Sequence, residues 1–455
     1  MEQSKRRFLV LPGRGISGKA MQASIFREKS SSFLAESLAH KVPRFSAAEF
    51  STALAAAPES AAVLTDTLEE MDFEVISQRF EDGPATIAMT ESARLALEAS
   101  NPELRVFPIT RYYLPGGRPR GRKKSGVPAS GISAESAVGA GGTIFMDDFK
   151  QHLSAGASGT AHGTGVTVGV LDTGVDNTHP ALQHSVSALR CFIPGVDSTA
   201  GTPANWGKAN ASRSGHGTHV AGIIAAKDGF GGPPGVAPNA QIVSYRIFPD
   251  SPSGPKPAEN PVIIDSIRAA IDDGCHIINL SIEGSTLRED GVRSAITDAW
   301  ENGVICVASA GNGWGNPVSF PAALQHCVAV TAIGRDTTFP DTPAFNAFVS
   351  DQRATSDPHI FLAKFSNFGP QVQFAAPGHA IVSTFPGGDW WFDSGTSMAA
   401  PYVSGLLASL LSDNTNILNM AGSAERSAAM LQMLVGRARA LGLPQKSQEG
   451  YGLPG

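Results

Sequence analysis

Short apolar runs rich in β-branched residues, separated by segments of helical periodicity, constrain this chain most. The apolar runs cover residues 166–171, 242–247, 277–282, 304–308 and 328–332, and the helix-like segments between them include 262–273 and 292–302. Strands buried on both faces of a parallel sheet have near-continuous hydrophobic runs, and their alternation with helices is typical of α/β folds. The sequence therefore predicts an α/β fold with a doubly wound, mostly parallel sheet.

A serine with unusually small neighbours lies in the segment 393–401, D-S-G-T-S-M-A-A-P. Ser397 precedes a long apolar stretch, and this pattern predicts the start of a helix. The backbone N–H groups at a helix start have no partner within the helix, so such a serine offers both an attacking oxygen and a donor for a developing oxyanion. The alternative is an ordinary capping serine on a buried helix, since serine is a favoured cap.

Two further residues complete the pattern needed for nucleophilic catalysis. Asp172 directly follows the run 166–171, and the carboxyl edge of an open α/β sheet is where ligands bind. His216 lies between Gly215 and Gly217 at the start of a helical pattern, and glycines allow close approach of the backbone. A turn aspartate before a glycine is the alternative for Asp172. We interpret His219, one turn further on, as a structural histidine.

These segments together resemble one family, the subtilisin-like serine proteases (subtilases, peptidase family S8). L-D-T-G-V-D, S-G-H-G-T-H-V-A-G and S-G-T-S-M-A-A-P occur in the order Asp, His, Ser, and V-I-C-V-A-S-A-G-N ends at Asn312. The resemblance implies a catalytic triad of Asp172, His216 and Ser397. It also implies that the Asn312 side chain and the Ser397 backbone N–H bind the oxyanion.

The same resemblance implies where a substrate binds. I-I-N-L-S-I-E-G resembles the edge segment that pairs with the substrate backbone as an added β-strand, and the segment before Asn312 resembles the facing wall of the first specificity pocket. The substrate-binding residues expected from these two segments are Ser281, Ile282, Glu283, Gly284, Ser309, Ala310 and Gly311.

Two positions depart from the family pattern. Glu283 stands where the family usually has a glycine, and Ser319 stands where a glycine often lines the pocket floor. Our hypothesis is a preference for small or basic side chains before the scissile bond. The alternative is that Glu283 points to solvent, as surface glutamates usually do.

The length of 455 residues predicts two domains, or one large domain with additions. Residues 1–115 are expected to form a small α+β domain, with strands at 8–11, 73–77 and 85–89, a helix at 91–99 capped by Thr90, and a last strand at 106–113. This order resembles the ferredoxin-like propeptide of subtilases, which assists folding and then inhibits the protease by lying on its active-site edge. An accessory or partner-binding domain is the alternative.

A linker and the catalytic domain follow. Residues 116–150 are rich in glycine and serine, open with a basic stretch between Arg118 and Lys124, and predict a flexible linker. The basic stretch is interpreted either as part of a solvated linker or as a site of self-cleavage. Residues 151–455 are expected to form the subtilisin-like catalytic domain. Its insertion 336–363 is interpreted as an inert surface excursion, with a lid or a substrate-contacting loop as the alternative.

Charge and composition limit the partners. A formal net charge of −6 favours neither nucleic acid nor an anionic membrane, so a peptide or protein substrate is expected. The basic amino-terminal residues precede an apolar run too short for a secretory signal, and no stretch is long enough to span a bilayer, which predicts a cytoplasmic protein. The four cysteines are expected to be buried or half-buried thiols rather than disulfides.

No cofactor is expected. Histidine and cysteine spacing does not suggest zinc. Ala181 replaces a common calcium ligand of the family, so calcium is possible only at a site that the sequence does not identify.

The leading prediction is a serine endopeptidase that acts through an acyl-enzyme and is made as a self-processing zymogen. The alternatives are a catalytically silent peptide-binding module, and an esterase or acyl transferase with the same triad. The sequence does not indicate the physiological substrate or the oligomeric state.

Overall fold

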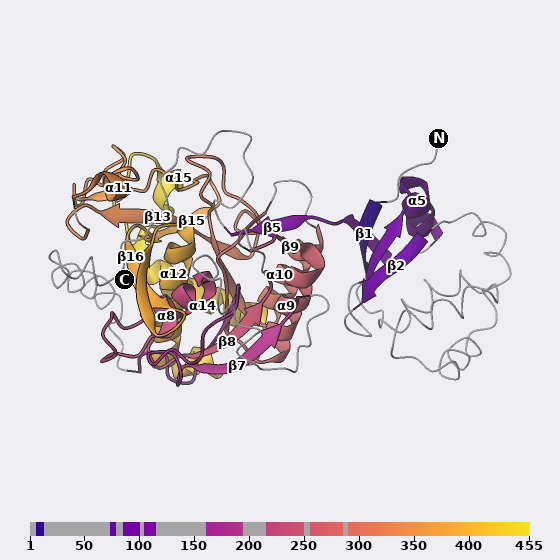
Figure 1. Cartoon of the computed structure of the whole chain (residues 1–455), viewed down its shortest axis with the longest axis horizontal. Coiled ribbons are helices and arrows are strands. Elements are labelled where there is room, and N and C mark those ends of the chain that lie inside the picture. Colours follow the sequence, from indigo (N-terminus) through magenta and orange to yellow (C-terminus); the bar gives the residue numbers. More distant parts are fainter. Residues whose placement is uncertain are drawn as a thin grey trace. The chain divides into compact units, whose positions relative to one another are not determined.

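The computed structural model describes residues 6–12, 73–78, 85–100, 104–114, 161–193, 215–249, 255–284, 290–339 and 341–455 (Figure 1). The chain divides into two compact units, Met1–Ile109 and Thr110–Gly455. The linker expected at 116–150 lies outside the described residues.

The first unit contains an antiparallel sheet with strand order β2-β3-β1-β4. Its elements are β1 (Arg6–Pro12), β2 (Phe73–Gln78), β3 (Ala85–Met89), α5 (Glu91–Ser100) and β4 (Leu104–Pro108). Thr90 caps α5, because its Oγ1 accepts the Ala93 N–H at 3.2 Å. A small core of buried residues that includes Phe8, Ile87 and Leu97 joins the sheet to the helix. The described part of the unit is therefore α+β.

One expectation for this region is wrong. A single strand was predicted over 106–113, but β4 ends at Pro108 and a separate strand, β5 (Arg111–Tyr113), belongs to the second unit. The pairing partners of β5 lie far away in the sequence, which is why local patterns could not separate the two strands.

The second unit is built on a mostly parallel sheet with strand order β14-β13-β12-β10-β6-β8-β7, and β15 also pairs with β13. Only the pairing of β13 with β14 is antiparallel among the described strands of this sheet. The strands are β6 (Thr167–Asp172), β7 (Val186–Cys191), β8 (Gln241–Arg246), β10 (Ile277–Leu280), β12 (Ile305–Ser309), β13 (Cys327–Arg335), β14 (Ile360–Leu362) and β15 (Val372–Pro377). The predicted α/β fold with a doubly wound, mostly parallel sheet is confirmed.

Helices and short strands surround this sheet. The helices are α8 (His216–Ala225), α9 (Asn260–Asp272), α10 (Asp290–Glu301), α11 (Pro343–Asn346), α12 (Thr396–Asp413), α13 (Thr415–Leu418), α14 (Ala424–Arg437) and α15 (Lys446–Glu449). The remaining strands are β9 (Ala258–Glu259), β11 (Glu283–Gly284), β16 (Ile381–Phe385), β17 (Asp389–Asp393), β18 (Ala438–Arg439) and β19 (Leu453–Pro454).

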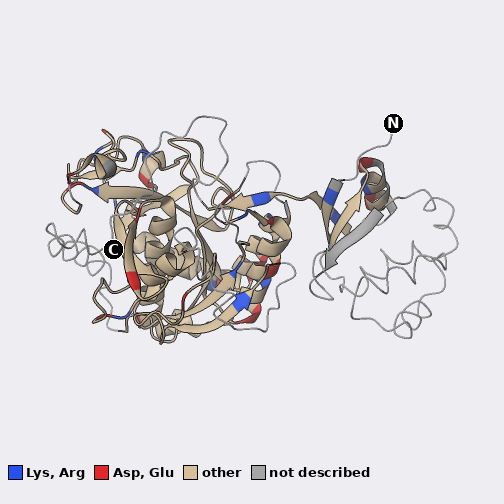
Figure 2. Ribbon diagram, viewed as in Figure 1, with Lys and Arg blue, Asp and Glu red and all other residues tan. Residues whose placement is uncertain are grey.

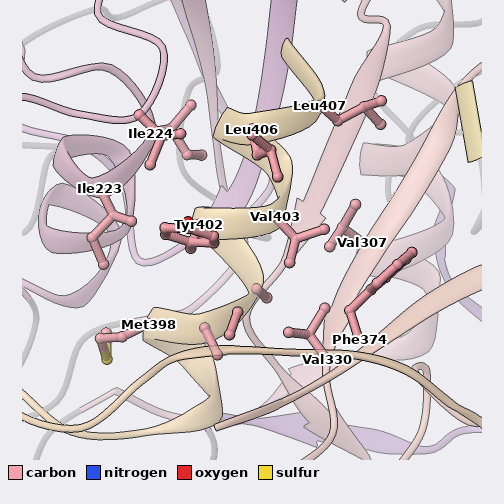
Figure 3. Packing of buried hydrophobic residues seen from close by; sticks show 14 of the residues in the cluster. Ile223, Ile224, Val307, Val330, Phe374, Met398, Tyr402, Val403, Leu406 and Leu407 are labelled. Atoms are coloured by element: carbon pink, nitrogen blue, oxygen red, sulfur yellow. The ribbon is translucent and has the colours of Figure 1, made fainter. Parts of the chain in front are cut away.

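Helix α12 lies at the centre of the core. Every residue from Thr396 to Ser412 is buried, and none of them carries a charge, so the ribbon of α12 is tan almost throughout in Figure 2. Tyr402, Val403 and Leu406 lie among side chains from α8, β12, β13 and β15 (Figure 3). Core side chains of this size each contribute about 1.5–3 kcal/mol when fully buried. The first turn of α12 is thus held by a rigid core.

The insertion 336–363 is part of the second unit and packs against the rest of it. It carries α11 and β14, and Phe339, Phe345 and Phe361 surround His379, with the Phe339 and His379 ring centroids 4.7 Å apart. The Nδ1 atom of His379 lies 3.0 Å from the Ser394 Oγ, three residues before Ser397. The insertion therefore packs around the histidine that contacts the turn leading to α12, and its expected inert role stays a prediction.

The four cysteines, Cys191, Cys275, Cys306 and Cys327, are buried free thiols. In the described part of the chain, no helix combines the length and the apolar character that crossing a membrane requires.

Candidate active site

Asp172 and His216 form a buried pair at the carboxyl edge of the sheet. Asp172 is the last residue of β6 and is fully buried, and His216 is the first residue of α8. The Nδ1 atom of His216 lies 2.9 Å from both Asp172 Oδ1 and Oδ2. The N–H of Thr173 donates a further hydrogen bond to Asp172 Oδ1 at 2.6 Å. Such a carboxylate orients an imidazole and stabilises its protonated form.

Burial and neighbouring carboxylates shift the pKa of His216 in opposite directions. Burial lowers the pKa of His216, but the charge and the hydrogen bond of Asp172, with a contribution from the charge of Asp393, outweigh it. The pKa of the imidazole therefore lies above its ordinary value of 6.5. A raised pKa makes the imidazole a stronger base for proton transfer.

The hairpin of β16 and β17 connects α8 to α12. Ser383 Oγ donates to the His219 carbonyl at 2.8 Å, and His219 Nε2 lies 3.0 Å from the Ile381 carbonyl and 3.1 Å from that of Trp391. β17 ends at Asp393, three residues before α12 begins. The helix of His216 and the helix of Ser397 are thus attached to one hairpin, and the buried His219 has contacts that fit its expected structural role.

Ser397 is the second residue of α12 and is 2% exposed. Its carbonyl accepts a hydrogen bond from Ser281 Oγ at 2.9 Å. The neighbouring Thr396 donates to Asn312 Oδ1 through its N–H at 3.0 Å and through its Oγ1 at 2.8 Å. The structure therefore brings Ser281, Asn312 and Ser397 together, as the sequence predicted for residues of one site.

Gly395 keeps a small space open beside Ser397. A Cβ atom built on Gly395 would lie 3.0 Å from Asn312 Nδ2 and 3.6 Å from the Ser397 backbone nitrogen. Its φ of 174° is an extended conformation that any residue adopts, so close approach rather than backbone conformation favours glycine here. The Asn312 side-chain nitrogen and the Ser397 backbone nitrogen thus both lie beside Gly395.

The expected peptide-binding edge is paired with the chain's own strand. β5 lies between β11 and β9 in a three-stranded antiparallel sheet, with Tyr113 opposite Glu283 and Tyr112 opposite both Gly284 and Ala258. Tyr112 is fully buried, and a Cβ atom on Gly284 would lie 2.7 Å from its ring. The segment from Thr110 therefore binds as an added strand. The sequence predicted this peptide-binding edge but not its pairing with β5.

Glu283 is buried rather than exposed. Only 5% of the residue is accessible, and its Oε2 accepts the Asn312 N–H at 3.2 Å. The alternative that Glu283 points to solvent is therefore wrong. A two-residue strand is too short for an alternating pattern to tell the buried face from the exposed one.

The facing wall is held to the same edge by hydrogen bonds. Ser309 Oγ donates to the Ile282 carbonyl at 3.1 Å, and the Ala310 carbonyl accepts the Ser319 N–H at 2.9 Å. Ser319 Oγ accepts the Asn367 Nδ2–H at 3.0 Å. Asn367, which also accepts the Gly313 N–H through Oδ1, is a buried support that the sequence analysis did not single out.

The calcium site suggested by the family does not fit this chain. Ala181 is fully buried and has no side-chain oxygen, so this position offers no side-chain ligand. Among the described residues, no group of three or more histidine, cysteine, aspartate and glutamate side chains could hold a metal ion.

Comparison with known proteins agrees with this geometry. Residues 163–452 match the model of the subtilase family. Thermitase from Thermoactinomyces vulgaris is 33% identical over 269 residues, which are 59% of this chain and 82% of the relative. Thermophilic serine proteinase from Bacillus sp. (strain AK1) is 34% identical over 282 residues, 62% of this chain and 59% of the relative.

A third relative extends the comparison. Subtilisin Savinase from Lederbergia lenta is 33% identical over 258 residues, 57% of this chain and 80% of the relative. The family match covers more than half of the 455 residues and includes Asp172, His216, Asn312 and Ser397. The chain therefore belongs to the subtilase family of subtilisin-like, serine-type endopeptidases.

Proposed function

We propose that the protein hydrolyses peptide bonds through an acyl-enzyme formed on Ser397. His216 removes the proton of the Ser397 hydroxyl as its oxygen attacks the scissile carbonyl carbon, and the imidazolium then returns a proton to the leaving amine. Water attacks the resulting ester with the same assistance and releases the acid. Asp172 holds the tautomer of His216 and stabilises the imidazolium between these steps.

The charge that develops on the carbonyl oxygen needs its own partners. Asn312 Nδ2 and the Ser397 backbone N–H are the donors proposed for it, and both face the space beside Gly395. Preorganised donors in a buried site act without a reorganisation cost at the moment of reaction. The observation that carries the proposal is the buried Asp172–His216 pair beside a helix start whose Thr396 is bound to Asn312.

Labelling of Ser397 tests this proposal. A fluorophosphonate should label the wild-type protein on Ser397 and leave Ser397→Ala unlabelled, and only the wild type should degrade casein. A properly folded wild-type protein that resists the label would support the silent peptide-binding alternative. Labelling accompanied by hydrolysis of simple esters but not of casein would support the esterase or acyl transferase alternative.

We also propose that the protein is made as a zymogen whose segment from Thr110 to Leu114 acts as an intramolecular inhibitor. β5 already supplies the strand that a peptide substrate would add to β11, with Tyr112 buried against Gly284. A substrate can pair with this edge only after β5 leaves. The domain that precedes β5 would then serve as the inhibitor-carrying domain.

Mass spectrometry of the purified wild type beside Ser397→Ala tests self-processing. Cleavage within the basic linker in the wild type alone is expected. An intact wild-type chain would contradict self-cleavage, and cleavage of both forms would show that another protease is responsible.

A further inference from the structure

Glu283 places a carboxylate inside the wall of the proposed active site. It lies on β11, the edge that pairs with an added strand, yet only 5% of the residue is exposed. Its Oε2 accepts the N–H of Asn312 at 3.2 Å, the residue whose side chain we assign to the oxyanion. The carboxylate therefore turns away from bulk solvent and toward the turn that follows β12.

The backbone of Gly311 packs closely against the carboxylate of Glu283. A Cβ atom on Gly311 would lie 3.0 Å from Glu283 Oε2 and 2.5 Å from Ser319 Oγ. Gly311 also has a φ of 103°, a left-handed conformation that favours glycine. Glu283 and the segment from Gly311 to Ser319 thus bring an acidic group and a hydroxyl close to the bare backbone of Gly311. We call this place the acidic subsite (Glu283, Gly311 and Ser319).

The acidic subsite lies beside the path of the added strand. Tyr113 of β5 is directly opposite Glu283, so a strand bound there runs past the subsite. The adjacent Gly311 N–H donates to Thr396 Oγ1 at 3.1 Å, which places the subsite next to the start of α12. A side chain of the residue that Ser397 attacks would therefore lie next to the acidic subsite.

We propose that the acidic subsite selects a lysine or arginine side chain immediately before the scissile bond. The inference rests on the proposed function and names its substrate class. A cationic side chain could donate hydrogen bonds to the buried carboxylate and to the Ser319 hydroxyl. A large apolar side chain would cover both groups with carbon atoms that offer no hydrogen bond, which is unfavourable. A buried carboxylate is a strong discriminator, because hydrogen bonds to charged groups contribute more than neutral ones.

The position of Glu283 adds an effect on the chemical step. A negative charge next to Asn312 opposes the negative charge that develops on the oxyanion. A bound lysine or arginine neutralises Glu283, so it should raise kcat as well as lower KM. The chain contains such residues between Arg118 and Lys124, in the linker where self-cleavage is proposed.

Peptides that differ only in the residue before the scissile bond test the inference. Full-length protein is titrated with a fluorophosphonate, and kcat/KM per reactive Ser397 is measured with lysine, arginine, alanine, leucine and phenylalanine at that position. The wild type should prefer lysine and arginine over leucine by about tenfold or more. Glu283→Gln should lose this preference, and Glu301→Gln, which removes an exposed carboxylate of α10, should keep it.

A second measurement does not depend on a variant. Peptide aldehydes that end in arginine should inhibit the wild type at about tenfold lower concentration than those that end in phenylalanine. The inference would be overturned, and the proposed function would stand, if the wild type favoured leucine or phenylalanine. The same conclusion would follow if the basic preference survived Glu283→Gln. Absence of both labelling and cleavage would instead reject the proposed function.

Discussion

At the scale of single residues, Asn312 has two separable tasks. Its Oδ1 accepts the N–H and the Oγ1–H of Thr396, and its Nδ2 faces the space beside Gly395. Asn312→Ala should lower kcat by about 10²–10³ with little change in KM, because an oxyanion donor acts in the transition state. Steady-state kinetics on a peptide substrate measures both constants.

Thr396→Val is the matched control for this prediction. It removes the Oγ1 donor to Asn312 Oδ1 and the acceptor of the Gly311 N–H, but keeps the N–H donor and the Nδ2 atom. A decrease in kcat of about tenfold is expected, in line with the loss of two neutral hydrogen bonds. An equal loss in both variants would mean that Asn312 acts mainly by holding the start of α12.

The charge of Asp393 helps to raise the pKa of His216, and the pH dependence of activity tests this effect. The acid limb of kcat/KM reports the pKa of the base in the free enzyme, and the pKa of His216 is raised above 6.5. Since the charge of Asp393 contributes to that increase, Asp393→Asn should move the acid limb to lower pH. Asp389→Asn, at the other end of β17, should leave it in place.

Salt provides an independent check on Asp393. Asp393 is exposed, so its effect on His216 is screened, and the difference between the two pH profiles should shrink as ionic strength rises. A pH profile unchanged by Asp393→Asn at low salt would show that the charge of Asp393 does not reach the imidazole.

At the scale of secondary-structure elements, β5 occupies the edge of β11. Burial of a tyrosine side chain contributes a few kcal/mol, so Tyr112→Ala should favour departure of the segment. In the Ser397→Ala background, a fluorescent substrate peptide should bind the full-length chain roughly tenfold or more tightly after this substitution. Fluorescence anisotropy measures the affinity.

Tyr113→Ala is the control, because the Tyr113 side chain lies on the opposite face of β5 and is only half-buried. Its effect should be clearly smaller. If both substitutions leave the affinity unchanged, β5 does not compete with the substrate for the edge.

Most of the elements that carry chemistry could be predicted from the sequence. The run 166–171 corresponds to β6, and the apolar stretch after Ser397 corresponds to α12, because buried strands and helices leave local hydrophobic patterns. The position of β5 could not be predicted, since its partners are far away in the sequence: Glu259 lies 148 residues after Arg111, and Glu283 lies 170 residues after Tyr113. The support of Ser394 by His379 depends on packing of the insertion and leaves no local pattern either.

At the scale of the whole molecule, two buried histidines should couple stability to pH. Burial lowers the pKa of His219 to about 4 and that of His379 to about 4, from an ordinary value of 6.5. Between pH 6.5 and 4 the unfolded chain takes up these protons and the native protein does not. The free energy of unfolding should therefore fall as the pH falls through this window, by on the order of 3 kcal/mol for each histidine.

The effect of these two histidines on stability can be separated from that of other titratable groups, because the groups act in different pH ranges. Asp176, Asp273 and Asp336 have pKa values below 3.8, so their stabilisation is lost only at lower pH. His216 acts in the opposite sense, because its raised pKa lets the native state bind a proton first. The histidines with lowered pKa values should consequently dominate between pH 6 and 4.5.

Denaturant unfolding of the Ser397→Ala chain tests this coupling without self-digestion. All five tryptophans, Trp206, Trp300, Trp314, Trp390 and Trp391, lie in the second unit, so their fluorescence follows its unfolding alone. His379→Asn places an amide atom near the position of Nδ1 and so can still bond Ser394 Oγ, but it does not titrate. It should therefore reduce the slope of stability against pH relative to the parent chain. Because His219 still titrates in this variant, the slope should be reduced and not abolished. A slope identical to that of the parent would show that His379 gains its proton equally well in the folded protein, which its burial among Phe339, Phe345 and Phe361 opposes.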